Sequence, residues 1–348
     1  MKFYIHETFK LFSMATVFLA AFLAISNLMA GTTAEQTVST PPKILLVIPH
    51  PDDETMFNMS RFTERGWDVT VVLVTSGENG SVVQSIVKNY NPKKDKDALI
   101  EKDPAVGVHA INPADCRVLQ EIPTHNQLAL ERRNEFIKSL SLYRVKTIYF
   151  LSSPEEFTFE DNWDNGVKNW NNTLLSKDLK YISNKTHPDI VITLNPDETW
   201  GHRQHWGLGK IVQSLWTEGA FDSQGKLRPE FYGIREYGWY KESQIPQNGD
   251  ESFRRDEFSQ VLGMTYADYW TKATSCYITQ SSHPIWSSAR IKADIVPGYG
   301  NLDVIRRLDK VDGRESLTKL FSEFHPDSEK MSELPAEPEI IKLPANSQ

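Results

Sequence analysis

The chain has 348 residues, of which 39% are hydrophobic and 24% are charged, so it is long enough to bury a large core. Its net charge is −8 and it contains no dense basic stretch, which argues against nucleic acid as its main partner. The composition therefore indicates a globular protein and leaves its activity open.

Residues 1–30 have the pattern of an export signal. Lys2 and Lys10 precede an apolar run over 11–25, and small residues follow it. A basic start, an apolar centre and a small residue at the cut are typical of a secretory signal peptide. The alternative is an uncleaved membrane anchor, because the run approaches the length that spans a bilayer. We expect a periplasmic or secreted protein, or an anchored one with an extracytoplasmic or lumenal domain, and a linker over 31–42.

Short apolar segments then alternate with helical patterns. The segments predicted as strands are 43–48, 69–75, 147–151, 190–194 and a less regular stretch around 231–240. The segments predicted as helices are 128–142 and 256–280. Alternating strands and helices favour a mostly parallel sheet covered by helices on both faces. The sequence therefore predicts a Rossmann-like α/β fold with a single catalytic domain over 43–322.

Two segments lack such patterns. Residues 81–115 are polar and lysine-rich, which predicts a long surface excursion. Residues 323–348 are rich in Pro, Glu and Ser, which predicts a disordered tail. The two cysteines, Cys116 and Cys276, either pair in an oxidising compartment or remain two separate buried thiols, and the sequence leaves both alternatives open.

A run of metal-binding side chains follows the first predicted strand, and its sequence is His50-Pro51-Asp52-Asp53-Glu54. The carboxyl end of a strand is where open α/β sheets bind their ligands. Imidazole and carboxylate groups are the zinc ligands of proteins when thiolates are absent. One of two adjacent carboxylates can hold the metal while its neighbour takes a proton from water. The run therefore predicts a metal-dependent hydrolase.

A second group of candidate ligands follows the fourth predicted strand. His202 and His205 lie three residues apart, so they share one face at the start of a helix. The tripeptide His-Pro-Asp also begins at His187 and His325, but only the first copy in the chain has a second Asp and a Glu after it. Because both groups follow strands of one predicted sheet, we expect them to converge.

In this order the residues resemble the PIG-L/LmbE family of zinc-dependent N-acetylglucosaminyl deacetylases. The segments that carry the resemblance are His50 to Glu54, Val74 to Gly80, Leu128-Ala129 with Arg132 and Glu135, Pro188 to Thr193, Gly201 to His205, and Lys272-Ala273 with Tyr277 and Gln280. Together they extend over most of the chain that follows the export signal.

The resemblance implies a role for each matching residue. It implies that His50, Asp53 and His205 bind the metal, which is zinc in the first place and Fe²⁺ or another divalent ion as the alternative. It implies that Asp52 is the general base. It also implies that His202 is a protonated histidine that stabilises the oxyanion or helps the amine to leave.

The resemblance further implies that Arg132 and Asp164 bind the substrate. The chain departs from the family at two places. Arg203 and Gln204 stand between the two late histidines, where the family often has Pro-Asp. Trp200 stands where some members have a tyrosine that polarises the substrate carbonyl.

The function implied by the resemblance is removal of the N-acetyl group from an N-acetylglucosamine-type sugar or glycoconjugate, with release of acetate and a free amine. The expected partner is therefore an N-acetylated amino sugar, and membrane contact is expected only through an uncleaved N-terminal segment. Two alternatives remain open, an amidase that acts on another N-acyl or thiol-sugar conjugate and a non-catalytic glycan-binding module.

Overall fold

The computed structural model describes residues 40–80, 82–83, 87–94, 100–101, 119–199, 201–235, 249–280, 302–309 and 316–343. The predicted export signal, most of the linker, Cys116 and Trp200 lie outside these residues. Cys276 is a free thiol. Within the described ranges no helix is both long and apolar enough to cross a membrane. The described residues from Pro41 onward fall in one compact unit.

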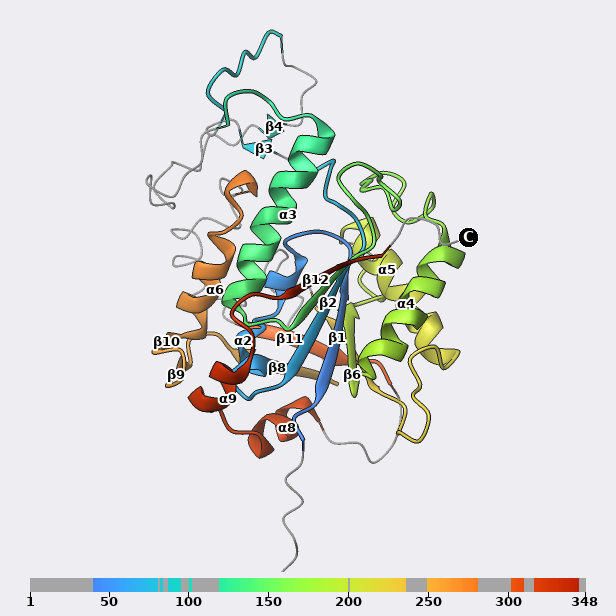
Figure 1. Ribbon diagram of the computed structural model, residues 1–348, viewed down its shortest axis with the longest axis vertical. Coiled ribbons are helices and arrows are strands. Elements are labelled where there is room, and N and C mark those ends of the chain that lie inside the picture. Colours follow the sequence, from blue (N-terminus) through green and yellow to red (C-terminus); the bar gives the residue numbers. More distant parts are fainter. Residues whose placement is uncertain are drawn as a thin grey trace, which may run out of the picture. The chain divides into compact units, whose positions relative to one another are not determined.

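A mostly parallel sheet forms the centre of this unit (Figure 1). Its strand order is β12-β5-β2-β1-β6-β7-β11-β8. The strands are β1 (Lys43–Ile48), β2 (Asp68–Leu73), β5 (Thr147–Phe150), β6 (Ile190–Leu194), β7 (Glu230–Ile234), β8 (Asp250–Arg254), β11 (Leu302–Arg307) and β12 (Glu339–Lys342). Neighbours from β12 to β7 pair in parallel, and β11 and β8 complete the sheet in antiparallel pairs. The predicted α/β class is confirmed.

The helices lie on both faces of the sheet. They are α2 (Ser60–Thr63), α3 (His125–Leu142), α4 (Asn172–Thr186), α5 (Arg203–Thr217), α6 (Tyr266–Thr274), α8 (Leu317–Glu323) and α9 (Ser328–Glu333), with short 3₁₀ helices η1 (Asp53–Met56) and η5 (Ile278–Gln280). Small two-stranded pairs join β3 (Val82–Val83) to β4 (Ile100–Glu101) and β9 (Phe258–Ser259) to β10 (Met264–Thr265).

Strand β1 shows how the sequence produces two cores. Ile44, Leu46 and Ile48 belong to one hydrophobic cluster, which α3, α6 and α8 also enter. Leu45 and Val47 belong to the other, with residues of α4 and α5. Successive side chains of a strand point to opposite faces, so a continuous apolar run fills both cores. Figure 1 shows α3 and α6 on one side of the sheet and α4 and α5 on the other.

The chain order of the strands places the site. From β1 the chain passes to β2 and then β5 on one side, and it returns to β6 and β7 on the other side. A parallel sheet opens a crevice at the carboxyl ends of its strands where the order reverses, here between β1 and β6. The run that begins at His50 follows β1, and the segment with His202 and His205 follows β6.

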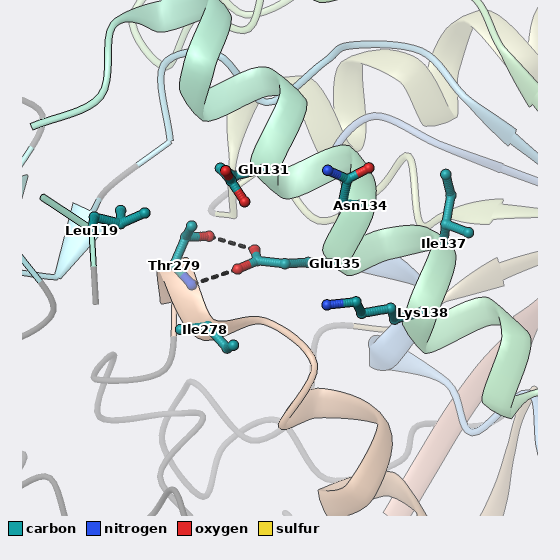
Figure 2. A pocket seen from close by; sticks show the side chains of 8 residues that line it. All are labelled: Leu119, Glu131, Asn134, Glu135, Ile137, Lys138, Ile278 and Thr279. Carbon is teal, nitrogen blue, oxygen red and sulfur yellow. Dashed lines mark hydrogen bonds between the residues drawn. The ribbon is translucent and has the colours of Figure 1, made fainter. Parts of the chain in front are cut away.

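Helix α3 is capped at its start and fixed along its side. Thr124 forms a capping box with Gln127, so α3 begins before the predicted residue 128. Glu135 of α3 accepts hydrogen bonds from the backbone N–H and the hydroxyl of Thr279, at 2.7 and 2.5 Å, beside a cavity of about 300 Å³ (Figure 2). These bonds tie α3 to the segment that follows α6.

Two predictions for the second half of the chain are wrong in part. The predicted helix over 256–280 is shorter, because β9 and β10 precede it and Thr265 caps α6 through Asp268 N. The predicted disorder from 323 onward is contradicted up to residue 343, where α9 and β12 form. Ile341 of β12 packs against the core, and β12 pairs with β5. Composition indicated a disordered tail, but backbone pairing with a distant strand stabilises the segment.

Candidate metal centre and catalytic site

Potential ligand atoms of three side chains converge where the loops after β1 and β6 meet. His50 Nδ1 lies 3.0 Å from Asp53 Oδ2 and 3.2 Å from His205 Nε2, and His205 Nε2 lies 3.0 Å from Asp53 Oδ1. All three side chains are buried. Tetrahedral coordination with bonds of about 2.0 Å separates ligand atoms by about 3.3 Å. The observed spacing therefore fits a divalent cation held by two imidazoles and one carboxylate.

The charges of this group also fit a cation. Burial alone lowers the pKa of His50, but the charges of Asp53 and Asp161 outweigh it and raise that pKa well above its usual value. Burial alone raises the pKa of Asp53, but His205 and His50 hold it well below its usual value. The carboxylate is thus ionised between two imidazoles, and a metal ion bound here would take the place of a ring proton.

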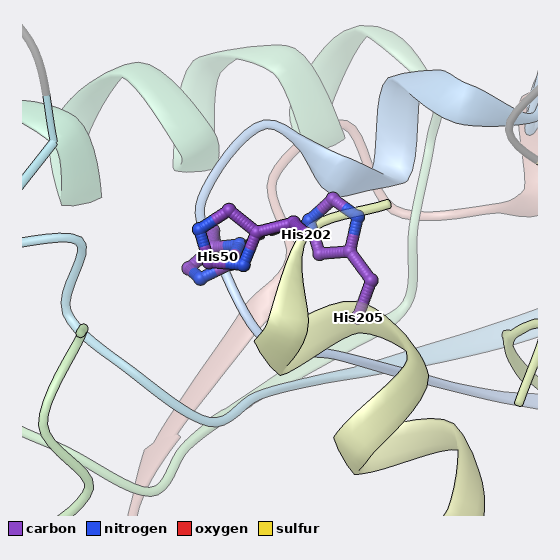
Figure 3. A group of neighbouring side chains, drawn as sticks. All are labelled: His50, His202 and His205. Carbon is purple, nitrogen blue, oxygen red and sulfur yellow. Dashed lines mark hydrogen bonds between the residues drawn. The ribbon is translucent and has the colours of Figure 1, made fainter. Parts of the chain in front are cut away.

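His202 lies beside this centre at the start of α5 (Figure 3). It offers a ring nitrogen within 4.8 Å of the ligand atoms of His50 and His205. Its Nδ1 accepts a hydrogen bond of 3.1 Å from the Gln204 backbone N–H, so Nε2 is the nitrogen that carries the proton. Burial and the neighbouring histidines lower its pKa, which makes His202 neutral. This differs from the protonated histidine that the resemblance implied.

An exposed tryptophan borders His202. Trp163 is 63% exposed, and its ring meets the His202 imidazole edge to face with centroids 4.2 Å apart. Most large apolar side chains of this domain are buried, so a tryptophan that stays exposed beside a polar site is available to a ligand.

Asp52 and Arg132 form an ion pair next to the centre. Arg132 Nη2 lies 2.9 Å from Asp52 Oδ2 and also donates to the Pro51 carbonyl, while Nη1 donates to the Gly77 carbonyl. Burial raises the pKa of Asp52 to about 6, although Arg132 lowers it. A carboxylate with such a pKa is ionised at neutral pH and is still basic enough to accept a proton.

Two glycines make room for the Arg132 guanidinium. A Cβ on Gly80 would lie 1.9 Å from Arg132 Nη1, and one on Gly77 would lie 2.9 Å from the same atom. Gly77 also has a φ of +68°, which L side chains rarely adopt. The glycines in the segment after β2 therefore permit the contact between α3 and Asp52. The predicted substrate contact of Arg132 stays a prediction.

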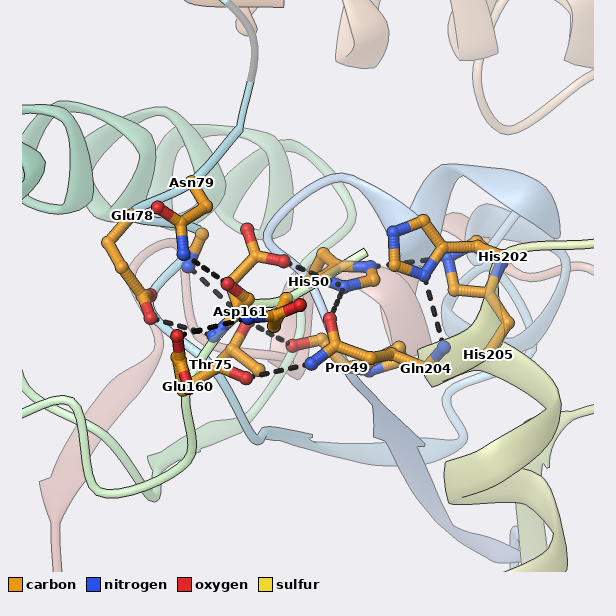
Figure 4. Close-up of polar contacts among 12 residues, drawn as sticks. Pro49, His50, Thr75, Glu78, Asn79, Glu160, Asp161, His202, Gln204 and His205 are labelled. Atoms are coloured by element: carbon orange, nitrogen blue, oxygen red, sulfur yellow. Dashed lines mark hydrogen bonds and ion pairs between the residues drawn. The ribbon is translucent and has the colours of Figure 1, made fainter. Parts of the chain in front are cut away.

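Asp161 and Gln204 belong to the site, although the sequence did not predict roles for them. Asp161 Oδ1 lies 3.5 Å from His50 Nε2, and Gln204 Oε1 lies 2.7 Å from the same nitrogen (Figure 4). Asp161 is held by the side chain of Glu78, which accepts its backbone N–H at 2.7 Å. Gln204 stands between two predicted site histidines, and this position was a signal in the sequence. Asp161 had no such signal, because only folding brings it to His50.

The remaining predicted residues lie around this group. Asp164 has an exposed side chain, and its backbone carbonyl accepts a hydrogen bond from Arg203. Its contact with substrate stays a prediction. Glu54 is fully buried, accepts hydrogen bonds from Ser139 and Tyr277, and has a pKa raised by burial to about 8. These bonds join η1 to α3 and to the segment that follows α6.

Comparisons with known proteins agree with this site. Residues 45–216 match the family model described as PIG-L, GlcNAc-PI de-N-acetylase. The chain is 27% identical over 174 residues to 1D-myo-inositol 2-acetamido-2-deoxy-alpha-D-glucopyranoside deacetylase 2 of Catenulispora acidiphila, and the alignment covers 48% of each protein. A stretch of 50 residues is 46% identical to deacetylase 1 of that name from Saccharopolyspora erythraea, covering 14% of this chain and 16% of that protein.

Among solved structures, N,N'-diacetylchitobiose deacetylase from Pyrococcus horikoshii has a TM-score of 0.44 and 17% sequence identity, over 82% of this chain and 92% of that one. The chain spans about half the length of the curated relatives that it matches. The family match runs from β1 to α5 and includes the residues of the candidate metal centre. Residues 45–216, about half of this chain, thus match the PIG-L family.

Proposed function

We propose that this chain is a metal-dependent N-deacetylase that acts on an N-acetylglucosamine-type sugar or glycoconjugate, with zinc as the metal. The observation that carries the proposal is the triangle formed by ligand atoms of His50, Asp53 and His205, with the carboxylate of Asp52 beside it. Two imidazoles and one carboxylate are a ligand set of catalytic zinc, which leaves a position for water or substrate.

Each residue of the site then has a chemical task. Zinc at such a centre supplies Lewis acidity toward the acetyl carbonyl and the attacking water. Asp52 accepts a proton from that water, and Arg132 holds the Asp52 carboxylate in place. His202 donates a hydrogen bond from Nε2 to the oxyanion, because its Nδ1 is already occupied by a backbone N–H. Asp52 then passes this proton to the amide nitrogen as the tetrahedral intermediate collapses, so that the C–N bond breaks and acetate and the amine are released.

The substrate class rests on the relatives and on the exposed aromatic ring. Two of the curated relatives are named as deacetylases of a 1D-myo-inositol 2-acetamido-2-deoxy-alpha-D-glucopyranoside. Trp163 provides a flat apolar surface on which a sugar ring can stack beside His202. The signal-like pattern of residues 1–30 supports export, and an exported enzyme would act on a wall, extracellular or lumenal glycan.

The test is product analysis with the zinc-loaded protein and a panel of N-acetylated sugars, from monosaccharides to oligomers and glycolipids. We expect equal amounts of acetate and free amine from at least one class, and no release by a metal-free His205→Ala variant. Release of other acids from other N-acyl compounds would favour the amidase alternative. Saturable glycan binding without release of any acid would favour the binding module.

A further inference from the structure

Gln204 connects the metal centre to the loop formed by residues 160–166. Its Oε1 lies 2.7 Å from His50 Nε2, and its Nε2 donates to the backbone carbonyls of Glu160 and Gly166, at 2.7 and 3.3 Å (Figure 4). The side chain is fully buried, so these groups replace its contacts with water. One amide therefore bonds both a candidate metal ligand and the two ends of the loop that carries Asp161 and Trp163.

These contacts fix the direction of the amide. Only the NH₂ group of Gln204 can donate to the two carbonyls, so the oxygen must face His50. Because that oxygen cannot donate, His50 Nε2 must carry the proton of the 2.7 Å hydrogen bond. The nitrogen left to bind a cation is His50 Nδ1, the atom that lies 3.0 Å from Asp53 and 3.2 Å from His205.

We propose that Gln204 is a positioning residue that keeps the proton of His50 on Nε2 and thereby presents Nδ1 to the metal ion. The inference rests on the metal centre of the proposed function, and it does not depend on which substrate is hydrolysed. A hydrogen bond to the second ring nitrogen orients a ligating histidine, and its loss weakens metal binding about tenfold to a hundredfold in other proteins.

At this position an amide can donate hydrogen bonds that a carboxylate cannot donate. The family often has Asp where this chain has Gln204, and a carboxylate would accept from His50 but could not donate to Glu160 and Gly166. The amide therefore adds a bond between the centre and the loop. Asp161 Oδ1 is a second acceptor for His50 Nε2, but at 3.5 Å it lies beyond a normal hydrogen bond.

The first measurement determines the ring nitrogen that binds the metal in the unchanged protein. Cadmium-113 replaces zinc in ¹⁵N-histidine-labelled protein, and NMR detects which nitrogen of each ring couples to the metal. We expect coupling to His50 Nδ1 and a slowly exchanging proton on Nε2. Coupling of the metal to His50 Nε2 would overturn the proposal, whatever the variants show.

The second measurement is zinc affinity by competition with a chelating dye. Gln204→Met removes the acceptor and should weaken zinc binding about tenfold or more. Gln204→Glu keeps an acceptor for His50 and should bind zinc within about threefold of the unchanged protein, by the same reasoning. Gln213→Met makes the same chemical change later in α5 and should have no effect. Affinity of Gln204→Met equal to that of Gln213→Met would show that Asp161 alone orients His50.

The outcomes separate this inference from the proposed function. Zinc binding with the expected NMR pattern, but without acetate release from any sugar, would remove the deacetylase and leave the role of Gln204 intact. A protein that binds neither zinc nor cadmium would remove both. If Gln204→Met does not fold, Gln204→Glu and the NMR pattern of the unchanged protein still decide the question.

Discussion

Asp52 and Arg132 bring two distant parts of the chain into one ion pair, with Oδ2 and Nη2 2.9 Å apart. Asp52 follows β1 and has a φ of 155° and a ψ of −18°, a combination that residues with a Cβ rarely adopt. Such backbone strain persists where surrounding contacts hold it, and it is concentrated at functional sites. The pair therefore fixes the orientation of the proposed base at the edge of the metal centre.

Replacing Arg132 should change the pH dependence of turnover. Arg132 lowers the pKa of Asp52, so Arg132→Met should raise that pKa above its present value of about 6. The ionised base is then formed only at higher pH, and the acidic limb of the kcat/KM profile should move upward. Arg133→Met is the matched control, because Arg133 lies on the same helix and its guanidinium stacks on Phe150. Identical acidic limbs in the two variants would contradict this role for Arg132.

Replacing Asp52 should separate catalysis from metal binding. Asp52→Asn keeps the size of the side chain but cannot accept the proton, so kcat should fall by about 10²- to 10⁴-fold. Zinc content should remain at the level of the unchanged protein, because Asp53 and not Asp52 contacts the two histidines. Mass spectrometry measures the zinc content, and the rate of acetate release measures kcat. Asp178→Asn, on α4, serves as the control, and full turnover by Asp52→Asn would exclude Asp52 as the base.

Replacing Trp163 should affect sugar binding more than chemistry. Trp163→Ala removes the exposed ring beside His202, so KM should rise by about tenfold while kcat changes less. Trp163→Phe retains an aromatic face and should restore most of the loss. Steady-state kinetics on the best substrate of the panel measure both constants. A fall in kcat at constant KM would mean that Trp163 instead positions His202.

Glu135 should make stability depend on pH. Burial raises the pKa of Glu135 to about 7, from its ordinary value of 4.5. Between these values the folded protein binds more protons than the unfolded chain, so the free energy of unfolding falls as pH rises and becomes level above pH 7. Across this pH range, the titration of Glu135 lowers the free energy of unfolding by about 3 kcal/mol.

The variant Glu135→Gln removes this titration and keeps an acceptor for Thr279. Urea unfolding at several pH values measures the difference in stability between the two proteins. Relative to the unchanged protein, the free energy of unfolding of Glu135→Gln should increase by about 3 kcal/mol between pH 4.5 and 7.5. A difference that stays constant over that range would show that the carboxyl titrates normally.

Much of the fold and part of the site could be predicted from the sequence because the signals are local. Segments 43–48 and 190–194 are continuous apolar runs, and both form strands at the predicted positions. The convergence of His50 with His205 followed from the position of each residue after a strand of one parallel sheet. That inference required topology but no detail of side-chain packing.

The rest depends on contacts between distant residues. Asp161 lies in an irregular loop after β5, and no periodic pattern indicates that it reaches His50. The family resemblance implied a role for Asp164 and none for Asp161. The orientation of Arg132 depends on space left by Gly77 and Gly80 in another segment. The role of Gln204 follows only from three hydrogen bonds whose partners lie far from it in the sequence.

Strand β12 has a consequence for solubility. It covers the outer side of β5, whose backbone N–H and C=O groups would otherwise form an open edge. Open edges are templates for pairing with other molecules, whereas a short strand with charged ends is a poor template. β12 is short and carries Glu339 and Lys342 at its ends. Proteolytic loss of this strand would therefore expose β5 and promote self-association while the catalytic residues remained in place.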